Sequence, residues 1–356
     1  MKPLRIGLAG FGRLARDYYL PAFRALPEAR LVAVADPLPQ SRDEAARRVP
    51  SAELYSDTSE MLDRAALDGL LVASLPSTHL AIWNDAARRG LPVFMEKPFV
   101  LSGQLDAIVR PEGGARLMID FNRRFWPPYR RAAELVSEGA LGAPAQLEYR
   151  LHVDVISWST VTRHRLSTGE GGILHDLGGH AIDLASDLLG GEPETVRAST
   201  ESARRPDDLS EARRLDVSEA RRLDRLRLDL AFPGGSTAFC DLAYAERTSE
   251  RLTIRGPKGT LRLPDPNMAL HVARNGRSGS ALPARSRDLA TFAYRAIRRD
   301  RSMARFSIRS ALDAFVRALG SGAAFVPGFE DAVRNVRWLE AAERSAREGR
   351  VVGRPA

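Results

Sequence analysis

The sequence predicts an α/β plus α+β protein with two domains. We expect a doubly wound parallel sheet over residues 1–122 and an open, mainly antiparallel sheet over residues 123–356. The chain has 356 residues with 44% hydrophobic content, which is enough for two cores. Its first third alternates short apolar runs with helical patterns, as parallel βα units do. Beyond residue 122, alternating apolar and polar residues indicate strands with one solvated face.

Composition narrows the class of protein. No run of 18 apolar residues appears, and the first residues enter a strand pattern directly, so we expect a soluble cytoplasmic protein. The single cysteine excludes an intramolecular disulfide and a cysteine-based zinc site. A net charge of +8 suggests nucleic acid as a partner. However, three residues are lysine and 50 of the 53 basic residues are arginine, spread among acidic residues, so we expect no nucleic-acid or membrane partner.

A glycine-rich turn follows the first predicted strand, residues 4–10. The turn consists of Gly10, Phe11, Gly12, Arg13, Leu14 and Ala15. A G-x-G-x-x-A pattern between a strand and a helix is typical of a dinucleotide-binding Rossmann turn. Gly10 permits the tight turn, Gly12 lets the backbone approach a pyrophosphate, and Ala15 lets the helix pack on the sheet.

The end of the next strand indicates which dinucleotide binds. Residues 31–35 end at Asp36, about twenty residues beyond the turn, where an acidic side chain hydrogen-bonds the adenosine ribose. Because Asp36 would repel a 2′-phosphate, we expect NAD as the cofactor. Arg42 nearby keeps NADP as the alternative.

Two further apolar strands end in candidate ligand-binding residues. Residues 69–73 precede a loop with Pro76 and His79, and residues 92–95 precede Glu96 and Lys97. The carboxyl ends of parallel strands are where doubly wound sheets bind their cofactors. Lysine is rare in this chain, which singles out Lys97. At a strand end it can hydrogen-bond a reacting oxygen and stabilise alkoxide character.

Residues 169–184 contain a second group of candidate catalytic residues. Asp176, His180 and Asp183 are spaced by four and then three, so in a helix they share one face. A carboxylate that orients an imidazole is suited to proton transfer. The alternative is a helix start with a capping carboxylate and a surface histidine. We expect no metal site, because His175 and His180 point in different directions on an α-helix.

Together these motifs resemble the Gfo/Idh/MocA family of nicotinamide-dependent sugar and cyclitol dehydrogenases over nearly the whole chain. The tail over residues 328–350 resembles the family's closing helix. The resemblance implies that Lys97, Asp176 and His180 form the catalytic set. It also implies a cis Lys97–Pro98 bond, and homodimers or homotetramers formed through the C-terminal sheet. Leu75 departs from the family, in which many members have threonine at this position.

The motifs and the resemblance together define a candidate site. The predicted cofactor-binding residues are Gly10, Phe11, Gly12, Arg13, Leu14, Asp36, Leu75, Pro76, His79, Glu96 and Lys97. The predicted substrate-binding residues are Asn122, Arg124, His152, Asp154, Trp158, Arg163, Arg165 and Asp183. For Arg124 and His152, a structural salt bridge is an equal alternative.

The cations around His164 favour a nucleotide sugar as the substrate, because arginine binds a diphosphate in a bidentate manner. Overall similarity also suggests oxidation at C3, as in oxidoreductases of bacterial antibiotic clusters. The alternatives are a free-sugar or inositol dehydrogenase, a lyase or hydrolase that holds NAD tightly, and a non-catalytic cofactor-binding relative.

Two segments receive no catalytic role. The seven residues 210–216 are repeated unchanged at 218–224, and we expect this duplication to lengthen a surface connection. Residues 264–290 are rich in proline, glycine, serine and arginine, and they predict a long loop.

Overall fold

A computed structural model describes residues 2–143, 145–154, 170–201, 224–245, 247–265, 270–274, 277–281 and 303–355. The chain forms two compact units. The first consists of Met1–Asn122 and Ala304–Val336, and the second of Arg123–Met303 and Arg337–Ala356. The sequence expectation divided the chain once, whereas residues 304–336 lie in the first unit. No helix in the described ranges is long and apolar enough to cross a membrane.

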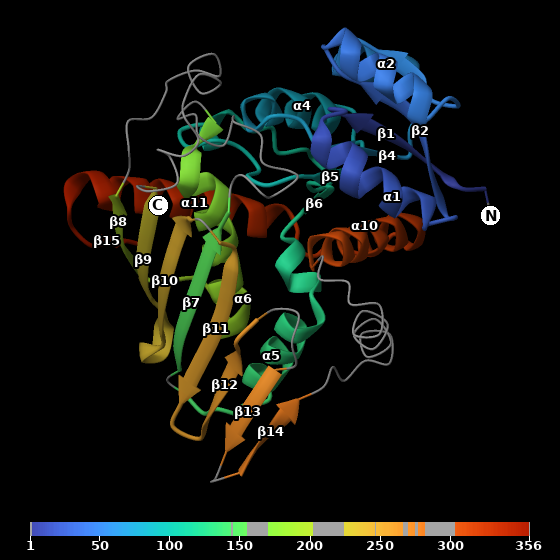
Figure 1. The fold of residues 1–356 in the computed structure, drawn as a ribbon. Coiled ribbons are helices and arrows are strands. Elements are labelled where there is room, and N and C mark those ends of the chain that lie inside the picture. Colours follow the sequence, from blue (N-terminus) through green and yellow to red (C-terminus); the bar gives the residue numbers. More distant parts are fainter. Residues whose placement is uncertain are drawn as a thin grey trace. The chain divides into compact units, whose positions relative to one another are not determined.

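The first unit is built on a six-stranded parallel sheet (Figure 1), which confirms the predicted doubly wound architecture. The strand order is β3-β2-β1-β4-β5-β6. The strands are β1 Leu4–Ala9, β2 Ala29–Ala35, β3 Glu53–Tyr55, β4 Gly69–Val72, β5 Val93–Met95 and β6 Leu117–Ile119. Because β2 and β4 flank β1 on opposite sides, the sheet has a topological switch point at the carboxyl ends of β1 and β4.

Helices connect these strands. They are the π-helical turn η1 Ala15–Tyr19, α1 Leu20–Arg24, α2 Pro39–Arg48, α3 Thr58–Arg64, α4 Pro76–Arg88, the short η2 Leu105–Ala107, α10 Met303–Ser321 and α11 Phe329–Glu348. Local sequence signals set several starts. Asp57 caps α3 by accepting hydrogen bonds from the backbone N–H groups of Ser59 and Glu60. Proline stands in the first turn of α2 and α4, where its missing N–H costs nothing.

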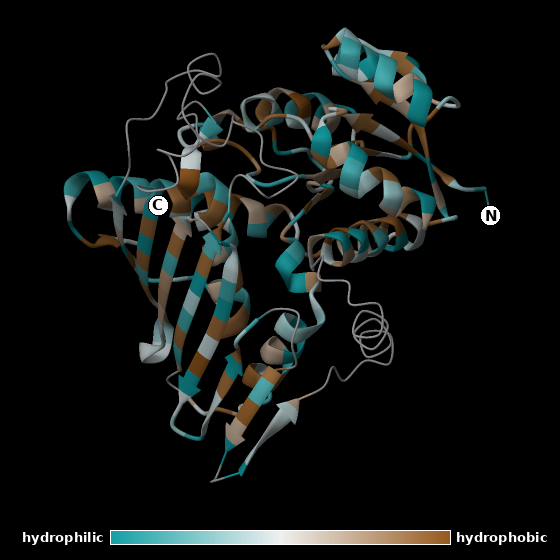
Figure 2. Cartoon of the chain, in the orientation of Figure 1, coloured by the Kyte–Doolittle hydropathy of each residue, from teal (hydrophilic) through white to brown (hydrophobic). Residues whose placement is uncertain are grey.

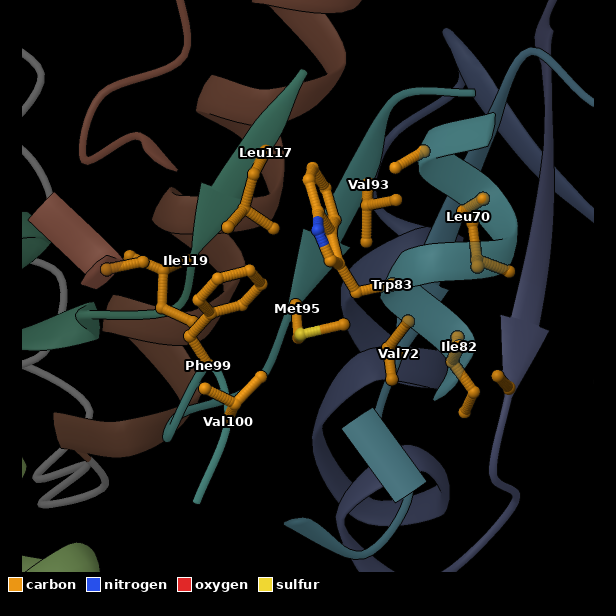
Figure 3. Packing of buried hydrophobic residues seen from close by; sticks show 14 of the residues in the cluster. Leu70, Val72, Ile82, Trp83, Val93, Met95, Phe99, Val100, Leu117 and Ile119 are labelled. Atoms are coloured by element: carbon orange, nitrogen blue, oxygen red, sulfur yellow. The ribbon is translucent and has the colours of Figure 1, made fainter. Parts of the chain in front are cut away.

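One buried cluster explains why residues 304–336 belong to the first unit. Figure 3 shows Trp83 of α4 among side chains from β4, β5 and β6. The Trp83 ring lies 5.3 Å from the ring of Phe99 and 5.4 Å from that of Phe329, measured between centroids. Phe329, Val333 and Val336 of α11 therefore complete a core that the strands alone leave open.

The second unit is built on a nine-stranded sheet in the order β14-β13-β12-β11-β7-β10-β9-β8-β15. The strands are β7 Gln146–Val153, β8 Thr195–Glu201, β9 Arg225–Ala231, β10 Thr237–Tyr244, β11 Ser249–Gly256, β12 Gly259–Leu263, β13 Leu270–Arg274, β14 Arg277–Ala281 and β15 Val352–Gly353. β7 and β10 pair in parallel and the other neighbours antiparallel. The predicted mainly antiparallel sheet is thus confirmed.

Alternation sets the two faces of this sheet, which is visible as teal and brown bands along the strands (Figure 2). In β9, Leu226 and Leu228 are buried, whereas Asp229 is exposed. Cys240 of β10 pairs with Leu228 and is fully buried. Burial raises the pKa of the Cys240 thiol to about 12.

The remaining described elements of the second unit are η3 Asn122–Phe125, α5 Pro127–Ser137, the π-helical turn η6 Leu174–Gly178, α6 Gly179–Leu189 and the short η7 Pro233–Gly235. The prediction of a loop over residues 264–290 was wrong in part, because β13 and β14 form a hairpin on the edge of the sheet. Backbone pairing holds this edge, and most β14 side chains are exposed, so its sequence carries no apolar period.

Candidate active site

The turn after β1 has the geometry of a cofactor cradle. Gly10 has φ 90°, and a Cβ atom on it would lie 2.7 Å from Ser74 Cα, so both conformation and space require glycine. A Cβ on Gly12 would meet no protein atom within 4 Å. Gly12 therefore faces open space at the start of η1, where a pyrophosphate can approach the backbone. Ala15 is fully buried, as packing of this helix on the sheet requires.

Asp36 joins the end of β2 to this turn. Its Oδ2 accepts a hydrogen bond of 2.7 Å from the Phe11 backbone N–H, and its Oδ1 accepts one of 2.9 Å from the Leu38 N–H. Arg42 donates to the backbone carbonyls of Asp36 and Pro37. A carboxylate accepts about four hydrogen bonds. Asp36 therefore has acceptor capacity left for ribose hydroxyls while it holds the glycine turn.

The loop that begins α4 contains Leu75, Pro76 and His79. Leu75 is extended and precedes the helix, and its carbonyl accepts from the Thr78 hydroxyl at 2.8 Å. His79 is fully buried: its Nδ1 lies 2.7 Å from the Pro98 carbonyl and its Nε2 lies 3.4 Å from that of Ser74. Burial lowers the pKa of His79 to about 4, so the ring is neutral and Nδ1–H donates to Pro98. The predicted cofactor contact of His79 stays a prediction, and the Nδ1–H bond ties α4 to the segment that follows β5.

Two carboxyl groups and a tyrosine hydroxyl meet at Glu96, the residue that directly precedes Lys97. The Lys97–Pro98 bond is cis, as expected. Tyr19 Oη lies 2.5 Å from Glu96 Oε1 and 2.6 Å from Asp120 Oδ2. Burial, together with the Asp120 and Glu96 charges, raises the pKa of Tyr19 well above its usual range. Burial and the charge of Glu96 likewise raise the pKa of Asp120. Neither Tyr19 nor Asp120 was among the predicted site residues.

In the second unit, the candidate catalytic stretch is not one regular helix. The Gly179 N–H donates to the Leu174 carbonyl, five residues earlier, which makes the first turn π-helical before α6 begins. Gly171 has φ 86°, and a Cβ there would overlap the His175 imidazole. The glycine before this helix thus admits the chain's own histidine. π-helical turns frequently occur at functional sites.

Asp176 and His180 are both buried, with 7% and 8% of their surface exposed, so a capped surface helix does not describe this stretch. Tyr244 of β10 donates a hydrogen bond of 3.2 Å from its hydroxyl to Asp176 Oδ2. Tyr244 was not among the predicted residues, because its contact with Asp176 joins a strand to a helix 68 residues away. The Tyr244 hydroxyl holds the Asp176 carboxylate, which in turn would orient the His180 imidazole.

Two of the described substrate-binding candidates, Arg124 and His152, each contact an acidic side chain. Arg124 forms a two-pronged ion pair with Asp183, with Nη2–Oδ1 at 2.5 Å and Nε–Oδ2 at 3.0 Å. His152 Nε2 lies 3.3 Å from Asp241 Oδ2, and partial burial lowers the pKa of His152 although Asp241 acts in the opposite sense. The Arg124 contacts agree with the salt-bridge alternative, whereas the lowered pKa of His152 makes its contact with Asp241 a hydrogen bond rather than an ion pair.

The other candidates stand apart from these pairs. The backbone N–H of buried Asp154 donates to the Thr248 hydroxyl at 3.0 Å. Asn122 begins η3 at the end of the first unit's first segment. Trp158, Arg163 and Arg165 lie outside the described residues, as do most of the duplicated segments. Arg13 is a surface residue that pairs with Asp17 at 3.4 Å.

Comparison with known proteins gives a family for this arrangement. Residues 4–110 match the family model described as "Oxidoreductase family, NAD-binding Rossmann fold". Residues 129–262 match the model of the GFO/IDH/MocA C-terminal domain. One matched range lies in each unit, and the two ranges include Lys97, Asp176 and His180.

Individual relatives agree with these matches. D-apiose dehydrogenase of Paraburkholderia graminis is 26% identical over 99% of this chain and 90% of its own length. Inositol 2-dehydrogenase of Burkholderia multivorans is 36% identical over 40% of this chain, and the match spans less than half, 44%, of that protein. The fold is similar to that of the WlbA dehydrogenase from Bordetella pertussis in complex with NADH and UDP-GlcNAcA, with a TM-score of 0.80, 21% identity and coverage of 100% and 99%. The chain therefore belongs to the Gfo/Idh/MocA family of NAD-binding oxidoreductases.

Proposed function

We propose that this protein transfers hydride between NAD and a secondary hydroxyl or ketone of a sugar or cyclitol, with Lys97, Asp176 and His180 as the catalytic residues. The observation that carries the proposal is the buried arrangement of Asp176 and His180 around a π-helical turn, with the Tyr244 hydroxyl bonded to Asp176. Burying a carboxylate and an imidazole on one short segment costs free energy. Buried titratable groups of this kind cluster at functional sites.

Each residue has a separate task in this reaction. In the oxidative direction, His180 accepts the proton of the substrate hydroxyl, and Asp176 orients the imidazole and stabilises its charged form. Lys97 donates a hydrogen bond to the same oxygen and stabilises its alkoxide character. The nicotinamide, when bound, accepts the hydride. In reduction, the same residues return the proton to the oxygen.

The cofactor would be held by the turn after β1. The open space at Gly12 would take the pyrophosphate, and Asp36 would accept hydrogen bonds from the adenosine ribose. Asp36 is buried with its carboxylate directed to the turn, which favours NAD over NADP. Arg42 is held by backbone carbonyls, and we expect it to contribute little to cofactor choice.

Different observations support two different classes of substrate. Similarity over nearly the whole chain to a D-apiose dehydrogenase favours a free sugar or cyclitol. The pair Arg163 and Arg165 favours a nucleotide sugar, because arginine binds a diphosphate in a bidentate manner. Oxidation at C3 rests only on the overall similarity to oxidoreductases of antibiotic clusters. Among the described residues, Arg124 is neutralised by Asp183, which leaves it a weak candidate for a diphosphate. We therefore place the free sugar or cyclitol first.

The open sheet of the second unit would also support assembly. Phe239 of β10 is 40% exposed among polar neighbours. We propose a homodimer or homotetramer in which this sheet face is covered. Sedimentation would give a mass of at least two chains, whereas a single-chain mass at micromolar concentration would contradict this proposal.

The function is tested by the absorbance of reduced nicotinamide. Purified protein would be given NAD and then NADP with free aldoses, inositols and UDP-sugars, and a carbonyl trap would pull an uphill oxidation forward. We expect a signal with NAD and one class of substrate. Lys97→Ala and His180→Ala should lower kcat by at least a hundredfold while NADH binding, followed by fluorescence, stays nearly unchanged.

Lys258→Ala serves as the matched control, because Lys258 is an exposed lysine between β11 and β12. Its activity should equal that of the wild type. Tight NADH binding without turnover on any substrate would contradict the dehydrogenase proposal and favour a tightly held cofactor or a non-catalytic role.

A further inference from the structure

Glu96 and Asp120 are adjacent because of the sheet register. Glu96 follows β5 directly and Asp120 follows β6 directly, and these parallel strands pair Met95 with Ile119. The two carboxyl groups therefore leave the same edge of the sheet side by side. Tyr19 reaches both from the π-helical turn η1. Tyr19 and Asp120 are fully buried, and Glu96 is 7% exposed.

The proton count of this cluster follows from its distances. A phenol hydroxyl has one proton, so Tyr19 can donate to only one of the two carboxyl groups. The second short contact needs a proton from the other carboxyl. Two ionised carboxylates at this separation in a buried place are also excluded by their mutual repulsion. The cluster thus holds one carboxylic acid, one phenol and one carboxylate.

The deeper carboxyl is the neutral one. Asp120 has no exposed surface, and burial raises its pKa well above its usual range, whereas Glu96 keeps some contact with the surface. A consistent chain of hydrogen bonds then runs from the Asp120 acid to the Tyr19 oxygen, and from the Tyr19 hydroxyl to the Glu96 carboxylate. The negative charge therefore rests on Glu96, which directly precedes Lys97 in the chain.

We propose that Tyr19 and Asp120 are positioning residues that hold Glu96 as a buried anion, and that this anion favours the charged form of Lys97 in the reaction proposed above. Across Pro98, the facing titratable group is His79, which is neutral above pH about 4 and adds no charge. Of the two chain neighbours of Lys97, Glu96 and Pro98, only Glu96 can carry a charge. At about 10 Å and an effective dielectric constant of about 20, one charge shifts the pKa of a neighbour by about one.

The scarcity of lysine allows a test that needs no turnover. The chain has three lysines, and Lys2 and Lys258 are exposed whereas Lys97 is half-buried. Competitive acylation of the NAD-free protein over a pH series, read by mass spectrometry, gives the pKa of each lysine, with Lys2 and Lys258 as internal references. We expect Glu96→Gln to lower the pKa of Lys97 by about one, and Asp120→Asn to leave it in place, because the amide resembles the neutral acid.

Tyr19→Phe provides a second variant in case Glu96→Gln does not fold. Loss of the hydroxyl donor weakens the Glu96 anion, so the pKa of Lys97 should fall by a smaller amount. Infrared spectra of the wild type at neutral pH should show a protonated carboxyl band that disappears in Asp120→Asn. The proposal is overturned if the band is absent, or if Glu96→Gln and Asp120→Asn move the Lys97 pKa equally or not at all.

Activity separates this proposal from the proposed function. If the wild type turns over, the limb of its kcat profile that Lys97 controls should move to lower pH in Glu96→Gln. If no substrate is turned over, the proposed function fails while the acylation and infrared results still decide the state of the cluster.

Discussion

Both units place candidate functional residues on a π-helical turn that follows a glycine of positive φ, but the two glycines are needed for different reasons. Gly10 precedes η1, and its missing Cβ makes room for the Ser74 backbone at the end of β4. Gly171 precedes η6, and its missing Cβ makes room for the His175 side chain four residues later. The missing Cβ of Gly10 therefore allows two strand ends to approach each other, whereas that of Gly171 makes room for a side chain of the same helix.

This difference predicts how each turn responds to change. Backbone at a strand end cannot move without disturbing the sheet, whereas an imidazole can rotate about its χ angles. We therefore expect the first turn to be rigid and intolerant. The second turn should tolerate substitution with a local rearrangement.

The largest effect is expected for Gly10→Ala. The new methyl group would collide with the Ser74 backbone at a φ of 90°, and we expect the free energy of unfolding to fall by about 3 kcal/mol. Urea unfolding measures this loss. Gly90→Ala is the matched control, because Gly90 has φ 65° but no neighbour within 4 Å, and it should cost about 1 kcal/mol. Equal losses in the two variants would show that the Ser74 contact does not matter.

Gly12→Ala changes the same turn at a position where no protein atom opposes a methyl group. Its methyl group would enter open space, so we expect unchanged stability but NADH affinity at least tenfold lower.

A second large effect should appear on acidification, because His79 of α4 is fully buried and its ring is neutral. The folded pKa is about 4 and the ordinary value is 6.5, so the unfolded chain binds this proton first. Stability from this group is complete above pH 6.5 and falls as pH decreases to about 4, with a total loss of about 3 kcal/mol. In urea titrations, His79→Asn should flatten this part of the pH dependence. An unchanged slope would contradict a neutral, buried His79.

Gly171→Ala should cost less than Gly10→Ala, about 2 kcal/mol, because rotation of the His175 ring relieves the overlap at Cγ and Nδ1 at the loss of its 3.2 Å contact with the Gly171 carbonyl. The overlap with the His175 Cβ, at 2.6 Å, requires a shift of the helix itself. A double-mutant cycle with His175→Ala isolates the clash. We expect the two changes to be non-additive, with His175→Ala restoring part of the loss. Full additivity would mean that the cost comes from φ alone.

The smallest effect is expected for Tyr244→Phe in the second unit. It removes one hydroxyl from Asp176 at 3.2 Å, which should cost about 1 kcal/mol of stability. In the proposed reaction, kcat should fall about tenfold with an unchanged KM for NAD, because Asp176 is oriented less well. A change in NAD affinity instead would place Tyr244 in cofactor binding.

The sequence predicted the features that local patterns encode. The strands, the glycine turn and the motif order are local, and the parallel and antiparallel sheets followed from them. The π-helical turns were not predicted, because one extra residue in a turn leaves hydrophobic periodicity almost unchanged.

Contacts between segments that are distant in the sequence could not be predicted from local patterns either. Tyr244 meets Asp176 only because β10 packs near η6, and Tyr19 meets Asp120 through the strand order. Helix α10 was overlooked in an arginine-rich segment, although its buried residues Ile308, Ala311, Leu312 and Phe315 have a clear helical period.

The burial of Cys240 has a practical consequence for following this protein in solution. The only cysteine of the chain has no exposed surface and a thiol pKa of about 12, so it is inert toward thiol-reactive dyes near neutral pH. Cysteines introduced at exposed positions such as Ser51 in the first unit and Ser199 in the second would then be the only labelled sites. Energy transfer between two dyes can therefore be recorded during NAD binding without first replacing a native residue.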